Sequence, residues 1–442
     1  MSRQVTIVGA GPAGSVLATF LGRQGHSVTV YESRPDLRQV DIDAGRSINL
    51  ALATRGIVVL EELGLLDDVV PLLIPMQGRM IHDAEGNQTL QPYGSRPEEV
   101  IYSVGRNELN AVLLDAAEAS GEVEIIFNQR CVGGDLPGGV LRFYDGLTDT
   151  EYDVGVQHVF GADGFGSEIR DLIQEHNTGT ELIEPLGHGY KEITLPAGPD
   201  GQHVIDANAL HIWPRGDFML IALADSAGTF TCTLFAPNED MESLDSAEAV
   251  MALFEGQFPD FVPLVPDLAD QYLANPAGRL ATLRVTEWQL GDRAVVLGDA
   301  AHAIVPFHGQ GMNAAIESVK VLMACLDGQA DWAAAFETFE RVRRPDTDAI
   351  ADMALDNYIE MRSSVQDEGY QLRRELALEL ERRVPDKFIP RYAMVMFNTM
   401  PYSEVQRKAT VQAALLKELT VEATTLDDVD LDMAAKLAAD IR

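Results

Sequence analysis

Three glycines near the start of the chain have the spacing of a phosphate-binding turn. Gly9, Gly11 and Gly14 follow a short apolar run at residues 4–8 and precede an apolar pattern with helical periodicity. Glycines at this spacing let the backbone turn tightly and approach a pyrophosphate, and the N–H groups at the start of the helix attract the phosphates. The spacing therefore predicts a dinucleotide site built from a strand, a tight turn and a helix.

Glu32 strengthens this interpretation. A second β-rich run at residues 26–31 predicts another strand, which ends directly before Glu32, so the chain opens with a βαβ unit. An acidic side chain at this place accepts hydrogen bonds from the hydroxyls of a ribose. A glycine-rich turn alone matches many unrelated loops, and it is the combination of strand, turn, helix and acid that favours dinucleotide binding.

Two later apolar runs each lead to an aspartate beside a glycine. Residues 154–160 predict a strand before Asp163, and residues 294–297 predict a buried strand before Asp299. Residues 309–313 then open a further helix. A helix N-terminus stabilises negative charge in front of it without the movement of any group.

Together and in this order, the three blocks resemble the FAD-dependent class A aromatic hydroxylases. The resemblance implies that Asp299 holds a ribityl hydroxyl and that the helix opened by residues 309–313 faces the pyrimidine end of the flavin. It also implies that Arg106 meets the phosphate or ribityl side, whereas the alternative for Arg106 is a surface arginine on a helix. The implied cofactor-binding residues are Gly9, Gly11, Ala13, Gly14, Glu32, Arg34, Ala51, Arg106, Cys131, Asp163, Asp299, Gly311, Met312 and Asn313.

Eight further segments narrow the resemblance to the kynurenine 3-monooxygenase family. They extend over nearly the whole chain and are not required by membership of the wider superfamily. The segments are residues 45–52, 78–82, 91–94, 188–192, 208–214, 305–313, 357–361 and 388–392.

The resemblance implies that an arginine, two tyrosines and an amide clasp the carboxylate of the amino acid kynurenine. A guanidinium pairs with a carboxylate through two parallel hydrogen bonds, and the other donors satisfy lone pairs that would be costly to bury alone. Alternating apolar residues would line the ring, although such residues on a strand belong to a core more often than to a pocket. The implied substrate-binding residues are Arg79, Tyr93, Asn357, Tyr392, Leu210, Met219, Ile221, Leu223, Phe235, Phe307 and His308.

The implied reaction is the hydroxylation of L-kynurenine to 3-hydroxy-L-kynurenine. The resemblance gives NADPH and O2 as co-substrates and a flavin C4a-hydroperoxide as the oxygen donor, in tryptophan catabolism or de novo NAD biosynthesis. Because the ring amino group activates the ortho carbon, no residue is required as acid or base, and we expect His308 and Phe307 to pack near the flavin. Two alternatives stay open: a class A hydroxylase of another amino-substituted aromatic acid, and a non-catalytic FAD-binding redox module.

The charge of the chain limits its partners. Among 442 residues, 69 Asp and Glu outnumber 33 Lys and Arg, which gives a formal net charge of −36. This field repels nucleic acid and anionic membrane surfaces, so neither is expected as a partner. Cys131, Cys232 and Cys325 lie far apart without a CxxC spacing, and the histidines lack metal-ligand spacings. We therefore expect reduced thiols and no metal. Because no apolar run reaches about 18 residues, we also expect a cytoplasmic protein without a membrane anchor.

We predict an α/β fold in which a Rossmann-like FAD-binding domain accompanies an inserted mixed β-sheet domain and a C-terminal helical unit. The expected domains are residues 1–72, 100–180 and 280–370 for FAD, residues 73–99 and 181–279 for the substrate, and residues 371–442 for the helical unit.

Within the helical unit, residues 403–423 predict an amphipathic helix that opens with a Ser403-x-x-Gln406 capping box. The acidic residues 427–442 also have helical periodicity. The oligomeric state stays open, with a homodimer as one candidate.

Overall fold

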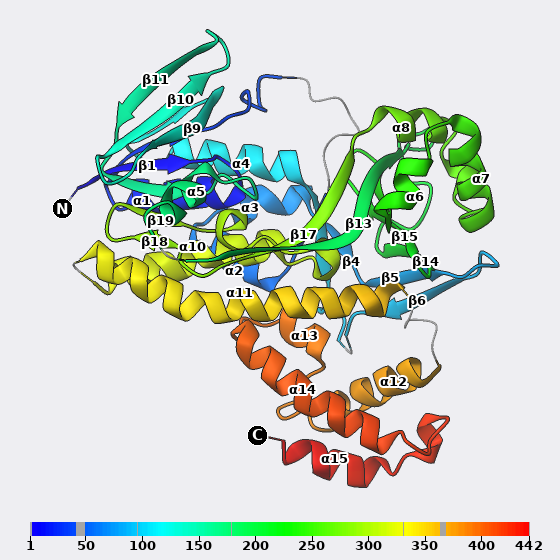
Figure 1. Ribbon diagram of the computed structural model, residues 1–442. Coiled ribbons are helices and arrows are strands. Elements are labelled where there is room, and N and C mark those ends of the chain that lie inside the picture. The colour runs from blue at the N-terminus through cyan, green and yellow to red at the C-terminus, as the bar shows by residue number, and fades with distance from the viewer. Residues whose placement is uncertain are drawn as a thin grey trace. The chain divides into compact units, whose positions relative to one another are not determined.

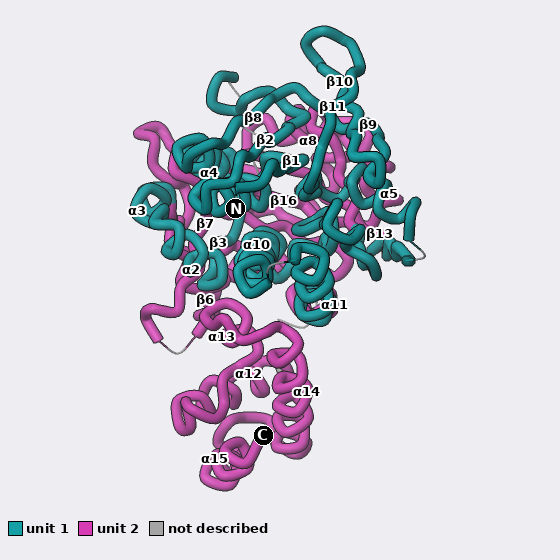
Figure 2. Tube along the Cα trace, turned by 90° about the vertical axis from the view of Figure 1, so that its left-hand side faces the viewer, with its two compact units in different colours: residues 1–72, 105–186, 281–348 teal, residues 73–104, 187–280, 349–442 magenta. Residues whose placement is uncertain are grey.

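The computed structural model describes residues 2–40, 49–94, 96–177, 179–329, 331–362 and 368–441. Residues 45–48, part of the segment 45–52 that contributes to the family resemblance, lie outside the described residues. The chain forms two compact units, which Figure 2 colours separately. Unit 1 consists of Met1–Leu72, Gly105–Leu186 and Ala281–Asp348, and unit 2 of Leu73–Val104, Gly187–Leu280 and Ala349–Arg442. The division into three domains stays a prediction.

The strands and helices of unit 1 carry labels in Figure 1. Its strands are β1 (Gln4–Val8), β2 (Ser27–Tyr31), β3 (Asn49–Leu52), β8 (Val123–Ile126), β9 (Gln129–Asp135), β10 (Val140–Asp145), β11 (Thr150–Gly155), β12 (His158–Gly161), β18 (Gln289–Leu290) and β19 (Ala294–Val296). Its helices are α1 (Pro12–Arg23), α2 (Thr54–Glu62), α3 (Leu66–Val69), η1 (Val70–Leu72), α4 (Arg106–Glu118), α5 (Glu168–Gln174), α9 (Asp299–His302), η3 (Pro306–His308) and α10 (Gly311–Asp327).

A largely parallel sheet forms the centre of unit 1. Its strand order is β18-β19-β12-β1-β2-β8, and its neighbouring strands are parallel except for the β18–β19 pair. Buried β-branched residues such as Val5, Ile7, Val28 and Val30 favour these strands, because a parallel sheet is covered on both faces. Helix α1 packs against α4 and α10. The predicted βαβ opening is therefore present.

The predicted single strand at residues 154–160 is wrong. Strand β11 ends at Gly155 and β12 begins at His158. The two strands belong to different sheets, because β11 pairs antiparallel with β10 whereas β12 pairs parallel with β1. The apolar run therefore contains a change of sheet that its hydrophobicity does not indicate.

Unit 2 is also a mixture of strands and helices. Its strands are β4 (Ile74–Met76), β5 (Gly78–His82), β6 (Gln88–Pro92), β14 (Leu210–Arg215), β15 (Phe218–Ala224) and β16 (Phe230–Pro237). Its helices are α6 (Asn238–Ser243), α7 (Ala247–Gln257), η2 (Val262–Leu264), α8 (Leu268–Ala274), α12 (Glu368–Arg383), α13 (Arg391–Met396), α14 (Tyr402–Leu419), η5 (Leu426–Asp428) and α15 (Leu431–Ala439). The elements with residues in both units are β7 (Ile101–Gly105), β13 (Glu181–Leu195), β17 (Ala277–Val285) and α11 (Trp332–Arg362).

A mixed sheet of order β17-β13-β16-β15-β14-β5-β6 organises unit 2. Strand β14 pairs parallel with β5 and antiparallel with β15. One face carries Trp213, Leu220 and Phe230, which pack with Phe254 and Phe258 from the α7 region in the main apolar core. Because side chains alternate between the faces of a strand, the intervening residues lie on the opposite face. The parallel sheet of unit 1, this mixed sheet and the C-terminal helices agree with the predicted α/β class.

The C-terminal helices form a small cluster in unit 2. Helices α12, α14 and α15 pack against one another, as Figure 1 shows in orange and red. Leu380, Phe388, Val429 and Ala434 are among the buried residues of their shared core. Among the helices of the described residues, none is long and apolar enough to cross a membrane.

The predicted capping box at Ser403 and Gln406 is wrong. Helix α14 begins at Tyr402, with Pro401 as its N-cap and no hydrogen bond from a capping side chain. The extended backbone of the proline and the burial of Tyr402 start the helix one residue earlier, so Ser403 lies inside the first turn. A capping box with both reciprocal hydrogen bonds occurs instead at the start of η5.

Candidate active site

Of the three glycines in the turn between β1 and α1, only Gly11 borders space for a phosphate, and Gly11 is the position at which the sequence predicts one. A Cβ atom on Gly9 would lie 2.4 Å from the carbonyl oxygen of Ala162, and one on Gly14 would lie 1.9 Å from that of Gly9. Gly9 also has a φ of 99°, which side-chain-bearing residues rarely adopt. By contrast, nothing lies within 4 Å of a Cβ on Gly11. Packing therefore requires Gly9 and Gly14, and Gly11 borders open space.

The start of α1 offers N–H groups to this space. Gly11 is the N-cap, without a capping side chain, and Pro12 opens the helix. The first N–H groups of a helix have no partner inside the helix, so they and the helix dipole favour an anion. Ala13 and Gly14 belong to this first turn and are buried.

Ala10 connects the turn to its surroundings. Its carbonyl accepts hydrogen bonds from the Ser15 hydroxyl and from the Asn110 side chain, each at 3.1 Å. Its N–H donates to Oε2 of Glu32 over 2.7 Å. The acid at the end of β2 thus helps to hold the turn that follows β1.

Glu32 is a buried, ionised acid. Arg34 donates to its Oε1 atom from the side chain over 2.8 Å and from the backbone N–H over 2.9 Å. Burial favours the neutral acid, but the hydrogen bonds from Arg34 and Ala10 outweigh it and lower the pKa of Glu32. An ionised carboxylate only accepts hydrogen bonds, which suits the ribose hydroxyls that the sequence predicts as its partners.

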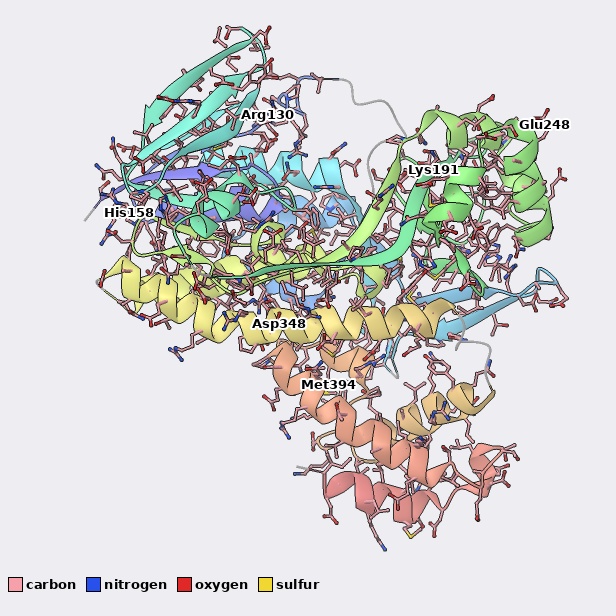
Figure 3. The ribbon with its side chains drawn as sticks, in the orientation of Figure 1. Arg130, His158, Lys191, Glu248, Asp348 and Met394 are labelled. Atoms are coloured by element: carbon pink, nitrogen blue, oxygen red, sulfur yellow. The ribbon has the colours of Figure 1, made fainter. Side chains whose placement is uncertain are left out.

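A cavity of about 500 Å³ opens beside this turn in unit 1. It brings together seven of the predicted cofactor residues, from positions up to 154 residues apart in the sequence. These are Gly9, Gly11, Glu32, Arg34, Arg106, Cys131 and Asp163. Gln129, Arg130 and Glu168 also line the cavity and were not predicted, because only their places at the start of β9 and of α5 could have indicated them. Figure 3 labels Arg130.

Burial raises the pKa of two of the predicted cofactor residues that line the cavity. Burial raises the pKa of the Cys131 thiol to about 12, so this thiol stays protonated and is a poor nucleophile. Burial also raises the pKa of Asp163, although the hydrogen bond that Asp163 accepts from the Ser167 hydroxyl acts to lower it. Ser167 caps α5 by accepting from the N–H of Arg170. Asp163 therefore helps to fix the start of α5 beside the cavity.

Asp299 opens α9 after Gly298, whose φ is 61°. Its side chain is exposed to solvent although protein surrounds it densely, as in the wall of a cleft. These surroundings raise the pKa of Asp299, and the charge of Arg106 acts in the opposite direction. Arg106 is the first residue of α4, and the buried Leu109 and Leu113 face the interior. The structure therefore brings Arg106 near Asp299.

The start of α10 is fixed by the side chain of Asn313. Its Oδ1 atom accepts from the N–H of Ala53 over 2.9 Å, and its Nδ2 atom donates to the carbonyls of Ala51 and Gly309. The first turn, which contains Gly311 and Met312, has no capping side chain. The Asn313 side chain therefore makes its hydrogen bonds within the protein. The backbone N–H groups of the first turn are the groups suited to bind a cofactor.

Phe307 and His308 lie in η3, directly before α10. Both side chains are buried. Their position next to the α10 N-terminus agrees with the expectation that they pack near the cofactor, which stays a prediction.

Unit 2 gathers the four residues predicted to bind a carboxylate. The Arg79 guanidinium lies over the Tyr392 ring, 4.7 Å from its centroid, and its Nη2 atom donates to Oδ1 of Asn357 over 3.4 Å. The rings of Tyr93 and Tyr392 stack 5.1 Å apart. The cluster joins β5, the segment after β6, α11 and α13.

Two polar atoms of this cluster are buried without a hydrogen-bond partner among the described residues: Nε of Arg79 and the hydroxyl of Tyr93. Burial lowers the pKa of Arg79, but neighbouring phenols and the Glu360 carboxylate outweigh it and raise the pKa above its usual value. Burial raises the pKa of Tyr93 well above its usual value. Arg79 is therefore charged and Tyr93 is a neutral hydroxyl, so both can donate to an anion.

Glu360 and Tyr370 join the cluster and were not predicted. Oε1 of Glu360 lies 3.7 Å from Nη1 of Arg79 and accepts a hydrogen bond from the Tyr370 hydroxyl. Oε2 of Glu360 accepts from Nη2 of Arg391 over 2.7 Å. The spacing from Asn357 to Glu360, three residues on one helix, is the signal that could have indicated Glu360.

The apolar residues predicted to line the substrate ring share one face of the mixed sheet. Met219 pairs with Phe235, and Ile221 pairs with Ile212 on the neighbouring strand. This face is opposite to the main core of the unit, and Arg79 on β5 pairs with Leu210 on β14. The predicted residues of this face are Leu210, Met219, Ile221, Leu223 and Phe235. Their assignment as a pocket rather than a core stays a prediction.

No group of three or more His, Cys, Asp or Glu side chains that could hold a metal occurs within the part of the chain that the structure describes. The three cysteines are free thiols, of which Cys131 and Cys232 are buried and Cys325 is partly exposed.

Comparisons with known proteins show the family to which the chain belongs. The model of the FAD binding domain family matches residues 2–354. A kynurenine 3-monooxygenase of Myxococcus xanthus is 43% identical over 436 residues, which cover 98% of this chain and 94% of that protein. One of Stenotrophomonas maltophilia is 44% identical over 432 residues, covering 97% and 95%. The chain belongs to the kynurenine 3-monooxygenase family. The predicted family, and with it the FAD-binding fold, is therefore confirmed.

Solved structures agree with the fold of this kynurenine 3-monooxygenase family member. The tetrameric form of 2-methyl-3-hydroxypyridine-5-carboxylic acid oxygenase matches with a TM-score of 0.66 and 22% identity, over 84% of this chain and 95% of that one. PqsL of Pseudomonas aeruginosa, in complex with 2-aminobenzoylacetate, matches with a TM-score of 0.65 and 22% identity, over 82% and 97%. At this identity both structures show the fold alone.

Proposed function

We propose that this chain is an NADPH- and FAD-dependent monooxygenase that converts L-kynurenine and O2 to 3-hydroxy-L-kynurenine. The observation that carries the proposal is the buried cluster of Arg79, Tyr93, Asn357 and Tyr392, which lies in unit 2 of a chain whose unit 1 has a dinucleotide cavity. Membership of the kynurenine 3-monooxygenase family supports it independently.

The residues of unit 1 fit FAD. Gly11 and the first turn of α1 would hold the pyrophosphate, Glu32 the ribose, and Asp299 the ribityl chain. The first turn of α10 would stabilise negative charge at the pyrimidine end. The chemistry that FAD supplies when bound is acceptance of a hydride from NADPH and activation of O2 for transfer of one oxygen atom.

The residues of unit 2 would bind and orient the substrate. Arg79 pairs with the carboxylate, while the Tyr93 hydroxyl supplies a further donor. The face of the sheet that carries Met219 and Phe235 takes the aromatic ring and excludes water. The amino group of the ring activates the position that is hydroxylated, so the proposal requires no residue as a general base, and His308 keeps a packing role.

An assay of NADPH oxidation tests the proposal. Purified FAD-loaded protein is given NADPH with and without L-kynurenine, and hydrogen peroxide and hydroxylated product are measured in the same sample. We expect oxidation to be stimulated by L-kynurenine, with little peroxide and product in proportion to NADPH used. Oxidation that does not depend on kynurenine would instead favour another amino-substituted aromatic acid as substrate, and the absence of turnover would favour a non-catalytic FAD module.

The partners and location belong to the same proposal. The free cysteines are consistent with a reducing compartment such as the cytoplasm. The acidic net charge argues against a nucleic acid partner. A homodimer stays a prediction, and light scattering after size-exclusion chromatography checks it.

A further inference from the structure

Arg343 is a buried arginine of α11 that reaches the first turns of α10. Its Nη2 atom donates a hydrogen bond of 3.0 Å to the carbonyl of Ala314. Ala314 is the fourth residue of α10, the helix whose first N–H groups are suited to the cofactor. Arg343 and the whole of α10 belong to unit 1, which also contains the dinucleotide cavity. The proposed function does not yet give this charged donor a role.

A second side chain donates to the same carbonyl. The Ser318 hydroxyl, one turn further along α10, donates to the carbonyl of Ala314 over 2.7 Å. Its oxygen accepts from Nε of Arg343 over 2.9 Å and lies 3.0 Å from Nε2 of His302. Because the hydroxyl has one hydrogen and gives it to Ala314, Nε2 of His302 is the donor in that contact. Hydrogen bonds therefore hold both donors in place on the Ala314 carbonyl.

Each charge in this buried group has an opposite partner. Oε2 of Glu317 lies 2.8 Å from Nη2 of Arg343, and Oε1 of the same carboxylate lies 2.7 Å from Nη1 of Arg55. Oδ2 of Asp346 is 3.8 Å from Nη1 of Arg343. Burial, together with the charge of Arg343, lowers the pKa of His302 to about 3, so this ring is neutral. The pairing offsets the cost of burial, and the group presents fixed N–H and O–H donors to α10.

One column of peptide groups connects the Ala314 carbonyl to the cofactor end of α10. In an α-helix each N–H donates to the carbonyl four residues earlier, so the peptide with the Ala314 carbonyl donates through the N–H of Ala315 to the carbonyl of Gly311. The peptide with the Gly311 carbonyl carries the N–H of Met312, which has no partner inside the helix. Hydrogen bonds in such a chain polarise one another. Donors on the Ala314 carbonyl therefore make the N–H of Met312 a stronger donor.

The charge on the flavin changes in the proposed reaction. A hydride carries one negative charge, so its acceptance leaves the flavin one charge more negative than the oxidised form. A stronger N–H donor at the pyrimidine end then stabilises the reduced form more than the oxidised form. We propose that Arg343 and Ser318 are positioning residues that act through the Ala314 carbonyl on the first turn of α10 and so raise the reduction potential of bound FAD. This inference rests on the proposed function, because it takes that turn as the partner of the flavin.

The midpoint potential of FAD-loaded protein tests the proposal, measured by equilibration with a redox dye during slow reduction. The wild type is compared with Arg343→Met, which removes the donors, and with Arg343→Lys, which keeps the charge and a donor. We expect Arg343→Met to stabilise reduced over oxidised flavin about 3- to 10-fold less than the wild type, which lowers the potential by about 15 to 30 mV in a two-electron couple. The potential of Arg343→Lys should lie between the two.

Arg344→Met is the matched control. It removes the same charge from the next residue of α11, whose guanidinium donates to Glu340 over 3.1 Å and to the carbonyl of Thr286. We expect the potential of the wild type. An unchanged potential in Arg343→Met would overturn the proposal. A shift of the same size in Arg344→Met would also overturn it, because the effect would then come from the net charge of the protein.

Ser318→Ala tests the same carbonyl and leaves the ion pairs around Arg343 in place, so it also decides the matter if Arg343→Met does not fold. We expect a shift in the same direction that corresponds to about twofold. Thr19→Val is its control, because the Thr19 hydroxyl likewise donates to a carbonyl four residues earlier, that of Ser15, over 2.8 Å. The first turn of α1 faces the pyrophosphate, whose charge does not change on reduction, so the potential should stay that of the wild type. An unchanged potential in Ser318→Ala would overturn the role of the Ala314 carbonyl.

The potentials are measured without kynurenine or NADPH, so they are independent of turnover. Wild-type potentials in both Arg343→Met and Ser318→Ala, in a protein that hydroxylates L-kynurenine, would overturn this inference alone. Lowered potentials in these variants of a protein that forms no hydroxylated product would support this inference and overturn the proposed substrate instead.

Discussion

Glu32 accepts a hydrogen bond of 2.7 Å from the backbone N–H of Ala10, which ties the acid at the end of β2 to the glycine-rich turn at the end of β1. The same carboxylate is held by Arg34. A residue that the sequence predicts as a ribose ligand therefore also supports the phosphate-binding turn. Replacement of Glu32 should therefore weaken nucleotide binding in two ways, through the loss of the predicted ribose contact and through the loss of support for the turn.

We expect Glu32→Gln to weaken FAD binding by about 10- to 100-fold, because an amide loses the charge-assisted hydrogen bonds of the carboxylate. Fluorescence titration of the FAD-free protein with FAD measures the effect. Glu124→Gln, on the exposed side of β8, is the control and should leave the affinity unchanged. An affinity for FAD that is the same in Glu32→Gln and wild type would contradict the assigned role of Glu32.

Asp299→Ala should reduce the fraction of purified protein that contains FAD. The side chain lies at the start of α9 near Arg106, where it is assigned to a ribityl hydroxyl. The ratio of flavin absorbance to protein absorbance gives the occupancy. Asp292→Ala removes a nearby exposed acid and should retain full occupancy. Full occupancy in Asp299→Ala would refute the ribityl assignment.

Arg79→Ala should raise KM for L-kynurenine by about 100-fold or more, because it removes the guanidinium that we propose pairs with the substrate carboxylate. The FAD content should stay that of the wild type, since Arg79 belongs to unit 2 and the dinucleotide cavity to unit 1. Steady-state kinetics and the flavin spectrum provide the two readings. Arg279→Ala, at an exposed arginine, is the control. An unchanged KM would exclude Arg79 as the carboxylate partner.

Local sequence patterns predicted the opening βαβ unit because the strand, turn and helix are contiguous and each has its own periodicity. The same kind of pattern failed at Ser403, where the conformation of Pro401 and the burial of Tyr402 decide the start of α14. It also failed at residues 154–160, where one apolar run supplies strands to two sheets. At residues 154–160 the deciding interaction is the tertiary pairing of strands, whereas at Ser403 the local conformation of Pro401 acts together with the tertiary burial of Tyr402.

The cluster around Arg79 was predictable only in part. Arg79 and Asn357 are 278 residues apart, so no spacing rule joins them, and the family resemblance alone brought them together. Tyr370 was not predicted because a tyrosine on a polar helix has no distinctive pattern, and for Glu360 only its spacing of three residues from Asn357 on α11 was available as a signal. Their significance comes from the hydrogen bond between them and from the proximity of Glu360 to Arg79.

A chain of hydrogen bonds that includes His82 of β5 and His211 of β14 predicts a pH dependence of stability. His82 contacts Asp260 through Nδ1 at 2.8 Å and His211 through Nε2 at 2.9 Å, and Nε2 of His211 contacts the carbonyl of Asp206 at 2.8 Å. A carbonyl can only accept, so His211 carries a proton on Nε2. In the neutral ring this leaves Nδ1 without a proton, facing Nε2 of His82. Protonation of His211 on Nδ1 would place a positive charge on a fully buried ring, which burial disfavours.

Burial lowers the pKa of His211 to about 4, from 6.5 in the unfolded chain. Between these values the unfolded state binds more protons than the folded state, so His211 lowers the free energy of unfolding by about 1.4 kcal/mol for each pH unit as the pH falls from about 6.5 to about 4. Urea unfolding at pH 7 and pH 5 should therefore show a smaller loss of stability in His211→Gln than in wild type. His176→Gln, at an exposed histidine, should lose as much as wild type. Equal losses in His211→Gln and wild type would mean that the pKa of His211 is not lowered in the folded protein.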